Sequence, residues 1–129
     1  MLRSLRWALA WALFILGLCL IPGGALPDWT WVSLLDLDKL VHLGMFLVLA
    51  VLLAAAFKEQ GRPSAFISSA VGIAILYGVG TEVLQGMEAL GRRTDAGDMI
   101  ANAVGAILGA VYVRARTRYG KPVLPIRLP

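Results

Sequence analysis

The sequence predicts an all-α integral membrane protein, a bundle of four transmembrane helices, from its composition and from the arrangement of its hydrophobic residues. Of 129 residues, 59% are hydrophobic and 16% are charged, and the mean hydropathy is +0.77. Soluble domains contain roughly 45–50% apolar residues. The hydrophobic residues also fall into separate runs, divided by short segments rich in Gly, Pro and charge. Both observations place the chain in a bilayer rather than in an aqueous compartment.

Four hydrophobic runs define the predicted helices. A helix needs about 20 mostly apolar residues to cross roughly 30 Å of hydrocarbon. We expect helices over residues 5–21, 40–57, 65–83 and 99–113, each near the lower limit of length. The connections are "IPGGALPD", "KEQGRPS" and "EALGRRTDAGD", which carry turn residues. Short helices with short connections predict one domain over residues 1–129 that ends in a basic tail, residues 114–129.

The first run has a second interpretation as a signal peptide, with basic residues before an apolar segment and a cleavage site after Ala25. Pro22 and Pro27 crowd that site, and a retained helix completes an even bundle, so we expect retention. Cys19 is the only cysteine and lies inside this run. Neither an intramolecular disulfide nor a cysteine-rich metal site can therefore form.

The basic residues predict the orientation, because Lys and Arg favour cytoplasmic loops. If the four helices alternate in direction, one side of the membrane receives nine of the 12 basic residues: Arg3, Arg6, Lys58, Arg62, Arg114, Arg116, Arg118, Lys121 and Arg127. The other side receives Lys39, Arg92 and Arg93 together with most of the acidic residues. Both termini are therefore expected in the cytoplasm. The basic residues form small groups rather than one polar face, so we expect no nucleic-acid partner.

Polar residues gather where three of the predicted helices meet the outer surface. "DKLVH" places Asp38 and His42 four residues apart, on one helical face. "TEVLQ" places Glu82 and Gln85 three residues apart, also on one face. Because these helices end at the same depth in the membrane, their polar side chains are expected to lie close together.

The last predicted helix carries its polar and small residues in a single stripe. "DMIANAVGAILG" places Asp98, Asn102, Gly105 and Gly109 at helical spacing. The two glycines form a small-xxx-small surface that lets two helices approach closely, so Asp98 and Asn102 should face the bundle interior. Asp95 is placed to cap this helix, and Asp98 lies in its first turn, where the helix dipole favours an anion.

These motifs resemble a known family in their order and spacing. "DKLVH", "GVGTEVLQ" and "RRTDAGDMIANAVGAILG" are similar to the pattern of VanZ-like bacterial membrane proteins: D-K-x-x-H, E-x-x-Q and R-x-x-D-x-x-D-x-x-x-N-x-x-G-x-x-x-G. The resemblance covers residues 38–113, and Arg92 has the family's spacing to Asp95 whereas Arg93 does not. It implies a multi-pass protein of the bacterial cytoplasmic (inner) membrane. It also implies a connection to glycopeptide resistance, particularly toward teicoplanin for the name-giving members, but no defined reaction.

The polar residues permit three hypotheses. The first is a site that binds or modifies a lipid-linked or cell-wall-related ligand at the outer face, where Lys39, Arg92 and Arg93 could hold a phosphate or carboxylate. The second is a small intramembrane enzyme with His42, Glu82 and Asp98 as catalytic residues. The third is an accessory subunit whose polar residues only hold the helices together. Candidate ligand-binding residues are Asp38, Lys39, His42, Glu82, Gln85, Arg92, Arg93, Asp95, Asp98 and Asn102.

A metal site would need His42 together with Glu82, Asp95 or Asp98, ligands that suit zinc, manganese or magnesium. No H-E-x-x-H motif or cysteine set is present in the sequence, and a histidine beside Asp38 is more often a hydrogen-bonding partner. The sequence therefore predicts neither a metal nor another cofactor, and the lipid bilayer is the expected surrounding of the helices.

Overall fold

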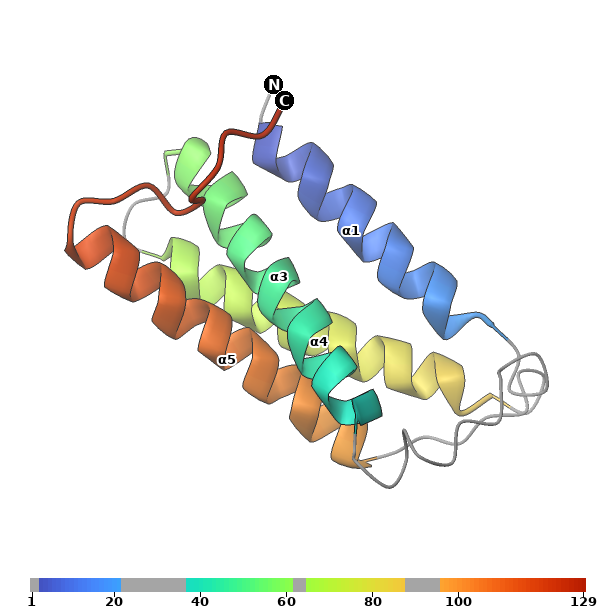
Figure 1. The fold of residues 1–129 in the computed structure, drawn as a ribbon. Helices are drawn as coiled ribbons and strands as arrows, with labels where there is room; N and C mark the ends of the chain where they lie inside the picture. The colour runs from blue at the N-terminus through green and yellow to red at the C-terminus, as the bar shows by residue number, and fades with distance from the viewer. Residues whose placement is uncertain (1–2, 22–36, 62–64, 88–95) are drawn as a thin grey trace.

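The computed structural model describes residues 3–21, 37–61, 65–87 and 96–129. These residues form four helices, α1 (Arg3–Cys19), α3 (Leu37–Glu59), α4 (Phe66–Gln85) and α5 (Ala96–Arg118), and the described ranges contain no strand. Successive helices run in opposite directions along the bundle (Figure 1). The predicted all-α fold of four helices is confirmed.

Three of the helices are long and apolar enough to cross a membrane: Asp38–Glu59, Phe66–Gln85 and Ala96–Arg118. The protein is therefore a multi-pass membrane protein. Helix α1 has 17 residues, fewer than the roughly 20 that a transmembrane helix needs. Its role as a fourth membrane span remains a prediction, as does the cytoplasmic location of the termini.

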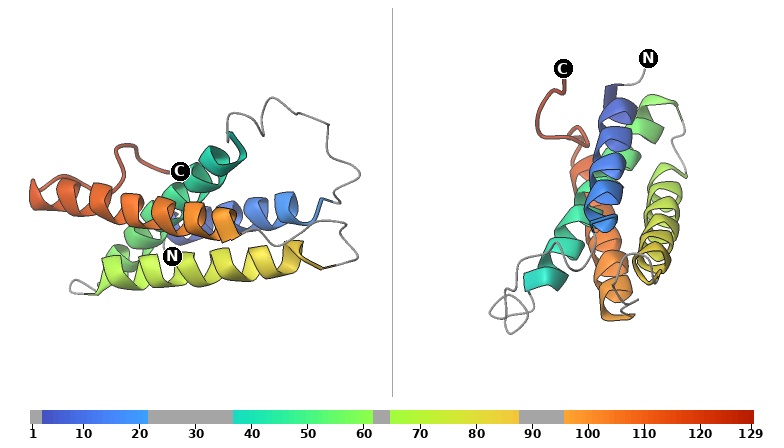
Figure 2. Two further views of the ribbon diagram at one scale, coloured as in Figure 1. Left: turned by 90° about the horizontal axis from the view of Figure 1, so that it is seen from below. Right: turned by 90° about the vertical axis from the view of Figure 1, so that its right-hand side faces the viewer.

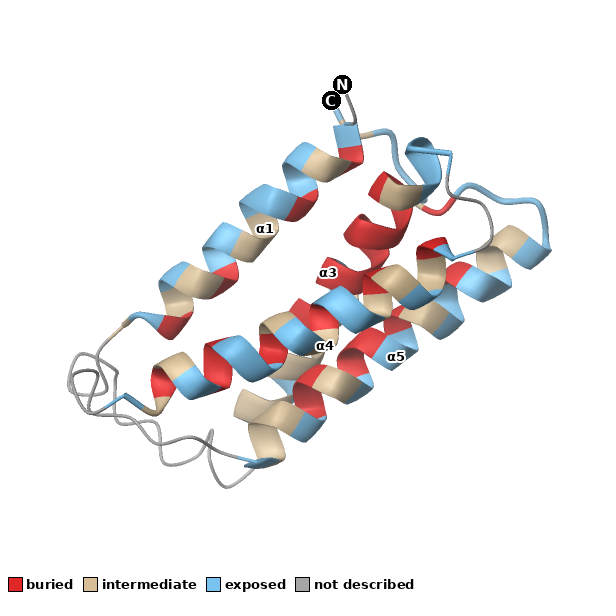
Figure 3. Cartoon of the chain, turned by 180° about the vertical axis from the view of Figure 1, so that it is seen from behind, coloured by how far each residue is buried: buried red, intermediate tan, exposed pale blue. Residues whose placement is uncertain are grey.

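Helix α3 lies at the centre of the bundle and contacts the other three helices. Its segment "LAVLLAAA" is buried along its whole length, as Figure 3 shows by colour. A helix that is apolar on all sides has no polar face to turn outward and is stable only when surrounded. The outer faces of α4 and α5 instead expose large apolar side chains such as Leu76, Val83 and Val111, which suits contact with lipid.

Helices α3 and α5 approach so closely that glycine is required between them. A Cβ atom built on Gly105 would overlap the carbonyl oxygen of Leu43, and one on Gly109 would lie 2.8 Å from the carbonyl oxygen of Leu47. The stripe of small residues on α5 is thus the packing surface for α3.

Helix α1 is attached by polar contacts near its start and in its middle. Near its start, the Ser4 hydroxyl donates a hydrogen bond of 2.5 Å to Glu59 Oε1 of α3. In its middle, Trp11 Nε1 donates to the carbonyl oxygen of Met45 at 2.9 Å. The Tyr77 hydroxyl of α4 donates to the carbonyl oxygen of Ala12 at 2.5 Å. These contacts flank an apolar face that buries residues Ala8, Ile15 and Cys19.

The C-terminal tail turns back along the bundle after α5. Gly120 has φ 67°, and the backbone N–H of Lys121 donates to the carbonyl oxygen of Arg116, a helix-ending arrangement that favours glycine. The tail then crosses to the start of α1, where the carbonyl oxygen of Pro129 accepts from Arg6 at 3.2 Å and from Trp7 at 3.4 Å (Figure 1). Together with the start of α1 and the end of α3, it borders a cavity of about 720 Å³.

Candidate functional site

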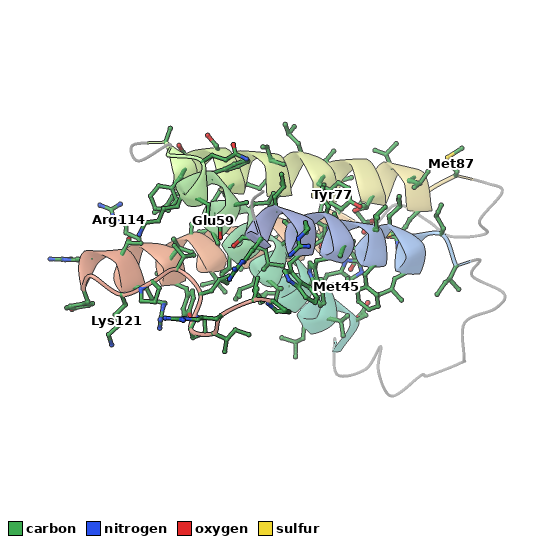
Figure 4. The ribbon with its side chains drawn as sticks, turned by 90° about the horizontal axis from the view of Figure 1, so that it is seen from above. Met45, Glu59, Tyr77, Met87, Arg114 and Lys121 are labelled. Carbon is green, nitrogen blue, oxygen red and sulfur yellow. The ribbon has the colours of Figure 1, made fainter. Side chains whose placement is uncertain are left out.

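Those predicted polar residues that the structure describes lie at the end of the bundle away from this tail. The start of α3, the end of α4 and the start of α5 all lie toward this end (Figure 2). Figure 4 shows Met87 at this end, with Glu59, Arg114 and Lys121 toward the other. The alternating helix directions, fixed by short connections, are what bring three distant stretches of sequence to one place.

The side chain of His42 lies at the centre of the site. Its Nδ1 atom is 3.0 Å from Asn102 Oδ1 of α5 and 3.9 Å from Glu82 Oε1 of α4. Its Nε2 atom is 3.8 Å from Asp98 Oδ2 of α5. One ligand atom from each of His42, Glu82 and Asp98 can be chosen so that all three lie within 4.8 Å of one another. We call His42, Glu82, Asp98 and Asn102, which come from three helices, the polar cluster.

The polar cluster is largely shielded from solvent. Glu82 is 0% exposed and Asn102 is 1% exposed, while the side chains of His42 and Asp98 are 12% and 14% exposed. The carboxylate of Glu82 therefore lies within the helix bundle, and Asp98 lies nearer its surface. Asp98 Oδ1 and Asn102 Nδ2 are buried and have no hydrogen-bond partner among the residues that the structure describes.

Two residues that the sequence analysis did not select shape the cluster. A Cβ atom at Gly78 would lie 3.1 Å from Asn102 Cβ and 3.2 Å from Phe46 Cε1, so only glycine leaves full space for both. Phe46 is 1% exposed and lies one turn beyond His42 on α3, while Gly78 lies one turn before Glu82 on α4. Each of these two residues lies four positions from a polar residue that the sequence analysis selected. This helical spacing is the signal that could have identified them.

Lys39 and Asp38 form the rim of the site. Lys39 Nζ is 3.6 Å from Asp98 Oδ1 and 3.9 Å from Asp38 Oδ2. The side chain of Asp38 is 46% exposed and pairs with Lys39, although it shares a helical face with His42. Gln85 is 4% exposed and follows Glu82 by three residues on α4. Arg92, Arg93 and Asp95 lie outside the described residues.

The chemistry available here is that of one imidazole, two carboxylates and one carboxamide. Such groups can exchange protons, bind a cation or hold hydrogen-bonding groups of a ligand. The nearby Thr81 hydroxyl donates to the carbonyl oxygen of Gly78 at 2.9 Å and is thus engaged within its own helix. Thr94 lies outside the described residues. The arrangement therefore favours acid–base chemistry or binding over attack by a hydroxyl group of the described chain.

Fold and site together define a class: a multi-pass helical membrane protein with a histidine and two acidic side chains gathered at one end of the bundle. A family model described as VanZ/LLP1 matches residues 6–117. The chain therefore belongs to the VanZ/LLP1 family, and the resemblance seen in its motifs is confirmed. No curated protein and no solved structure matches the chain.

Proposed function

We propose that this protein binds or modifies a cell-envelope ligand, lipid-linked or related to the cell wall, through the polar cluster at the outer face of the bacterial cytoplasmic membrane. The observation that carries the proposal is the complete burial of Glu82 beside His42, in a bundle whose buried residues are mostly apolar. Ionisable residues inside membrane proteins are rare and usually functional. Polar contacts between membrane helices contribute only about 0.6 kcal/mol on average. Helix attachment alone is therefore a weak reason for this cluster.

The rim supports a ligand with anionic groups. Lys39 is partly exposed and lies 3.6 Å from Asp98, so its ammonium group can contact a ligand that enters from the surface. Arg92 and Arg93 add two basic residues to the connection before α5. Phosphate and carboxylate groups of lipid-linked cell-wall intermediates are the expected partners of such side chains. The resemblance to VanZ-like proteins implies a link to glycopeptide resistance, so teicoplanin is the probe.

A second candidate is a small intramembrane enzyme. The 3.0 Å contact with Asn102 holds the imidazole of His42, and its ring nitrogens lie 3.8 and 3.9 Å from Asp98 and Glu82. An oriented imidazole near two carboxylates is suited to general acid–base catalysis. The third hypothesis, an accessory subunit, makes no use of these charges.

Teicoplanin susceptibility tests the proposal. Overproduction in a susceptible bacterium should shift the minimal inhibitory concentration, and Glu82→Gln, Asp98→Asn and His42→Ala should each abolish the shift at equal abundance in the membrane. Glu59→Gln is the matched control, because Glu59 lies at the opposite end of α3 and hydrogen-bonds Ser4. A shift that persists in all three cluster variants would favour the accessory-subunit hypothesis.

A further inference from the structure

The geometry points to a site for a divalent transition-metal cation, zinc or manganese, bound by His42, Glu82 and Asp98 within the polar cluster. Neither the family match nor the proposed function assigns such a site. One ligand atom from each side chain lies within 4.8 Å of the others. Imidazole nitrogen and carboxylate oxygen are ligands that both cations accept.

The distances suit a shared ion better than direct hydrogen bonds. His42 Nε2, the ring nitrogen opposite the Asn102 contact, lies 3.8 Å from Asp98 Oδ2, beyond hydrogen-bonding range. One ligand atom of Glu82 lies within 4.8 Å of ligand atoms of the other two residues. Ligand atoms about 2.0–2.1 Å from a tetrahedral zinc ion lie roughly 3.3 Å apart. Modest side-chain rotations would therefore bring these atoms around one ion.

The surroundings of the three ligands supply further support. Asn102 Oδ1 contacts His42 Nδ1 at 3.0 Å, the kind of outer contact that orients a metal-binding histidine. Asn102 is 1% exposed, and its Nδ2 atom has no hydrogen-bond partner in the described ranges. Asp98 Oδ1 is also buried without such a partner, with Lys39 Nζ at 3.6 Å. A bound ion that carries water molecules would give these atoms partners.

Charge balance favours a divalent ion. Two carboxylates lie close to an imidazole that is neutral when it binds a metal. Lys39 is shared between Asp98 and Asp38, whereas a divalent cation would offset the charges of both ligand carboxylates. Because Lys39 repels a bound cation, its removal should strengthen cation binding, while the same change should weaken the binding of an anionic ligand.

The test is metal binding by the full-length protein purified in detergent without chelators. Metal analysis should find zinc or manganese at about one ion per chain. After chelation, titration with ZnCl2 or MnCl2 should restore one ion. The ligand variants His42→Ala, Glu82→Gln and Asp98→Asn should each weaken binding by about 100-fold or more. Asn102→Ala should weaken it by about 10–100-fold. The control variant Glu59→Gln should leave binding unchanged. Lys39→Gln should tighten it.

A variant that gains a spectroscopic signal keeps the inference testable if the loss-of-binding variants fail to fold. Asp98→Cys loaded with Co²⁺ should show a thiolate-to-cobalt absorption band that the wild type lacks. Absence of stoichiometric binding by the wild type would overturn the inference, as would unchanged binding in all three ligand variants or a missing band in a folded Asp98→Cys protein. Metal content is independent of teicoplanin susceptibility, so either proposal can fail alone.

Discussion

Gly105 fixes the distance between α3 and α5 at the level of a single atom. A Cβ atom there would overlap a backbone oxygen, that of Leu43, rather than the end of a flexible side chain. A backbone atom cannot move aside by changing a rotamer. A methyl group at residue 105 would therefore force the two helices apart. His42 immediately precedes Leu43, and Asn102 lies three residues before Gly105, so separation at this point would also disturb the polar cluster.

We expect Gly105→Ala to reduce stability by about 1–3 kcal/mol, the usual effect of overpacking, and to lower the amount of folded protein. Gly80→Ala is the matched control, since Gly80 is exposed on α4 and its Cβ position has nothing within 4 Å. That change should be neutral or stabilising by up to about 1 kcal/mol, because alanine favours a helix. Thermal unfolding in detergent, followed by loss of the monodisperse peak in size-exclusion chromatography, compares the two. Equal stability would mean that the helices are not in close contact.

At the scale of elements, α1 depends on few polar contacts with its neighbours. Trp11 and Tyr77 each form one hydrogen bond between α1 and the remaining helices, and in both the acceptor is a backbone carbonyl. Hydrogen bonds between membrane helices contribute about 0.6 kcal/mol on average, and up to about 1.7 kcal/mol. The attachment of α1 should therefore respond measurably when both are removed.

We predict that Trp11→Phe combined with Tyr77→Phe loosens α1 while the other three helices remain packed. Cys19 is the natural probe, because it is the only cysteine, lies in α1 and is 2% exposed. Its reaction with a small membrane-permeable maleimide should be slow in the wild type and several-fold faster in the double variant, with SDS-denatured protein defining complete reaction. An unchanged rate would show that apolar packing and the Ser4–Glu59 contact hold α1 without these two hydrogen bonds.

The elements could largely be predicted from the sequence, because hydropathy detects the part of a helix that lies in lipid. It misses helical turns that extend beyond the lipid. The predicted helix over residues 99–113 is part of α5, which begins at Ala96 and continues to Arg118. Arg116 and Arg118 lie in its last turn, where the helix dipole favours cations. Part of the predicted basic tail is therefore helical.

Contacts between helices were harder to predict than positions within one helix. The period of 3.6 residues placed Asp98, Asn102 and Gly105 on one face of α5, and the structure has all three facing the bundle. The same reasoning placed Asp38 beside His42, but the partner of His42 is Asn102, and Asp38 pairs with Lys39 at the rim. Periodicity gives the direction of a side chain but not the rotation or depth of the neighbouring helix.

At the scale of the whole molecule, charge is distributed unequally between the two ends. The described basic residues, apart from Lys39, lie with the start of α1, the end of α3 and the end of α5: Arg3, Arg6, Lys58, Arg114, Arg116, Arg118, Lys121 and Arg127. The polar cluster lies toward the opposite end, with the start of α3, the end of α4 and the start of α5. Met87, which follows α4, marks this end in Figure 4. By the preference of Lys and Arg for the cytoplasm, the cluster should face outward.

Thiol labelling in intact cells tests this orientation. In a Cys19→Ser background, Met87→Cys should react with a membrane-impermeant reagent and Gln60→Cys should not, since the two exposed positions lie at opposite ends of the bundle. Both should react after the cells are lysed. Labelling of Gln60→Cys alone would place the polar cluster at the cytoplasmic face and remove direct access to cell-wall intermediates.

The contribution of three helices to one cluster also sets an order of events during synthesis. His42 on α3 is made first, Glu82 on α4 next, and Asp98 and Asn102 on α5 last. At about 5–20 residues per second, α5 is completed roughly 2–7 s after α4. Until α5 is in place, His42 is the one cluster residue available to Glu82, and the backbone of α3 at Leu43 lacks its contact with Gly105. A ribosome that pauses or a chain that is cut between α4 and α5 would leave an acidic side chain without half of its cluster, a state that membrane proteases could recognise.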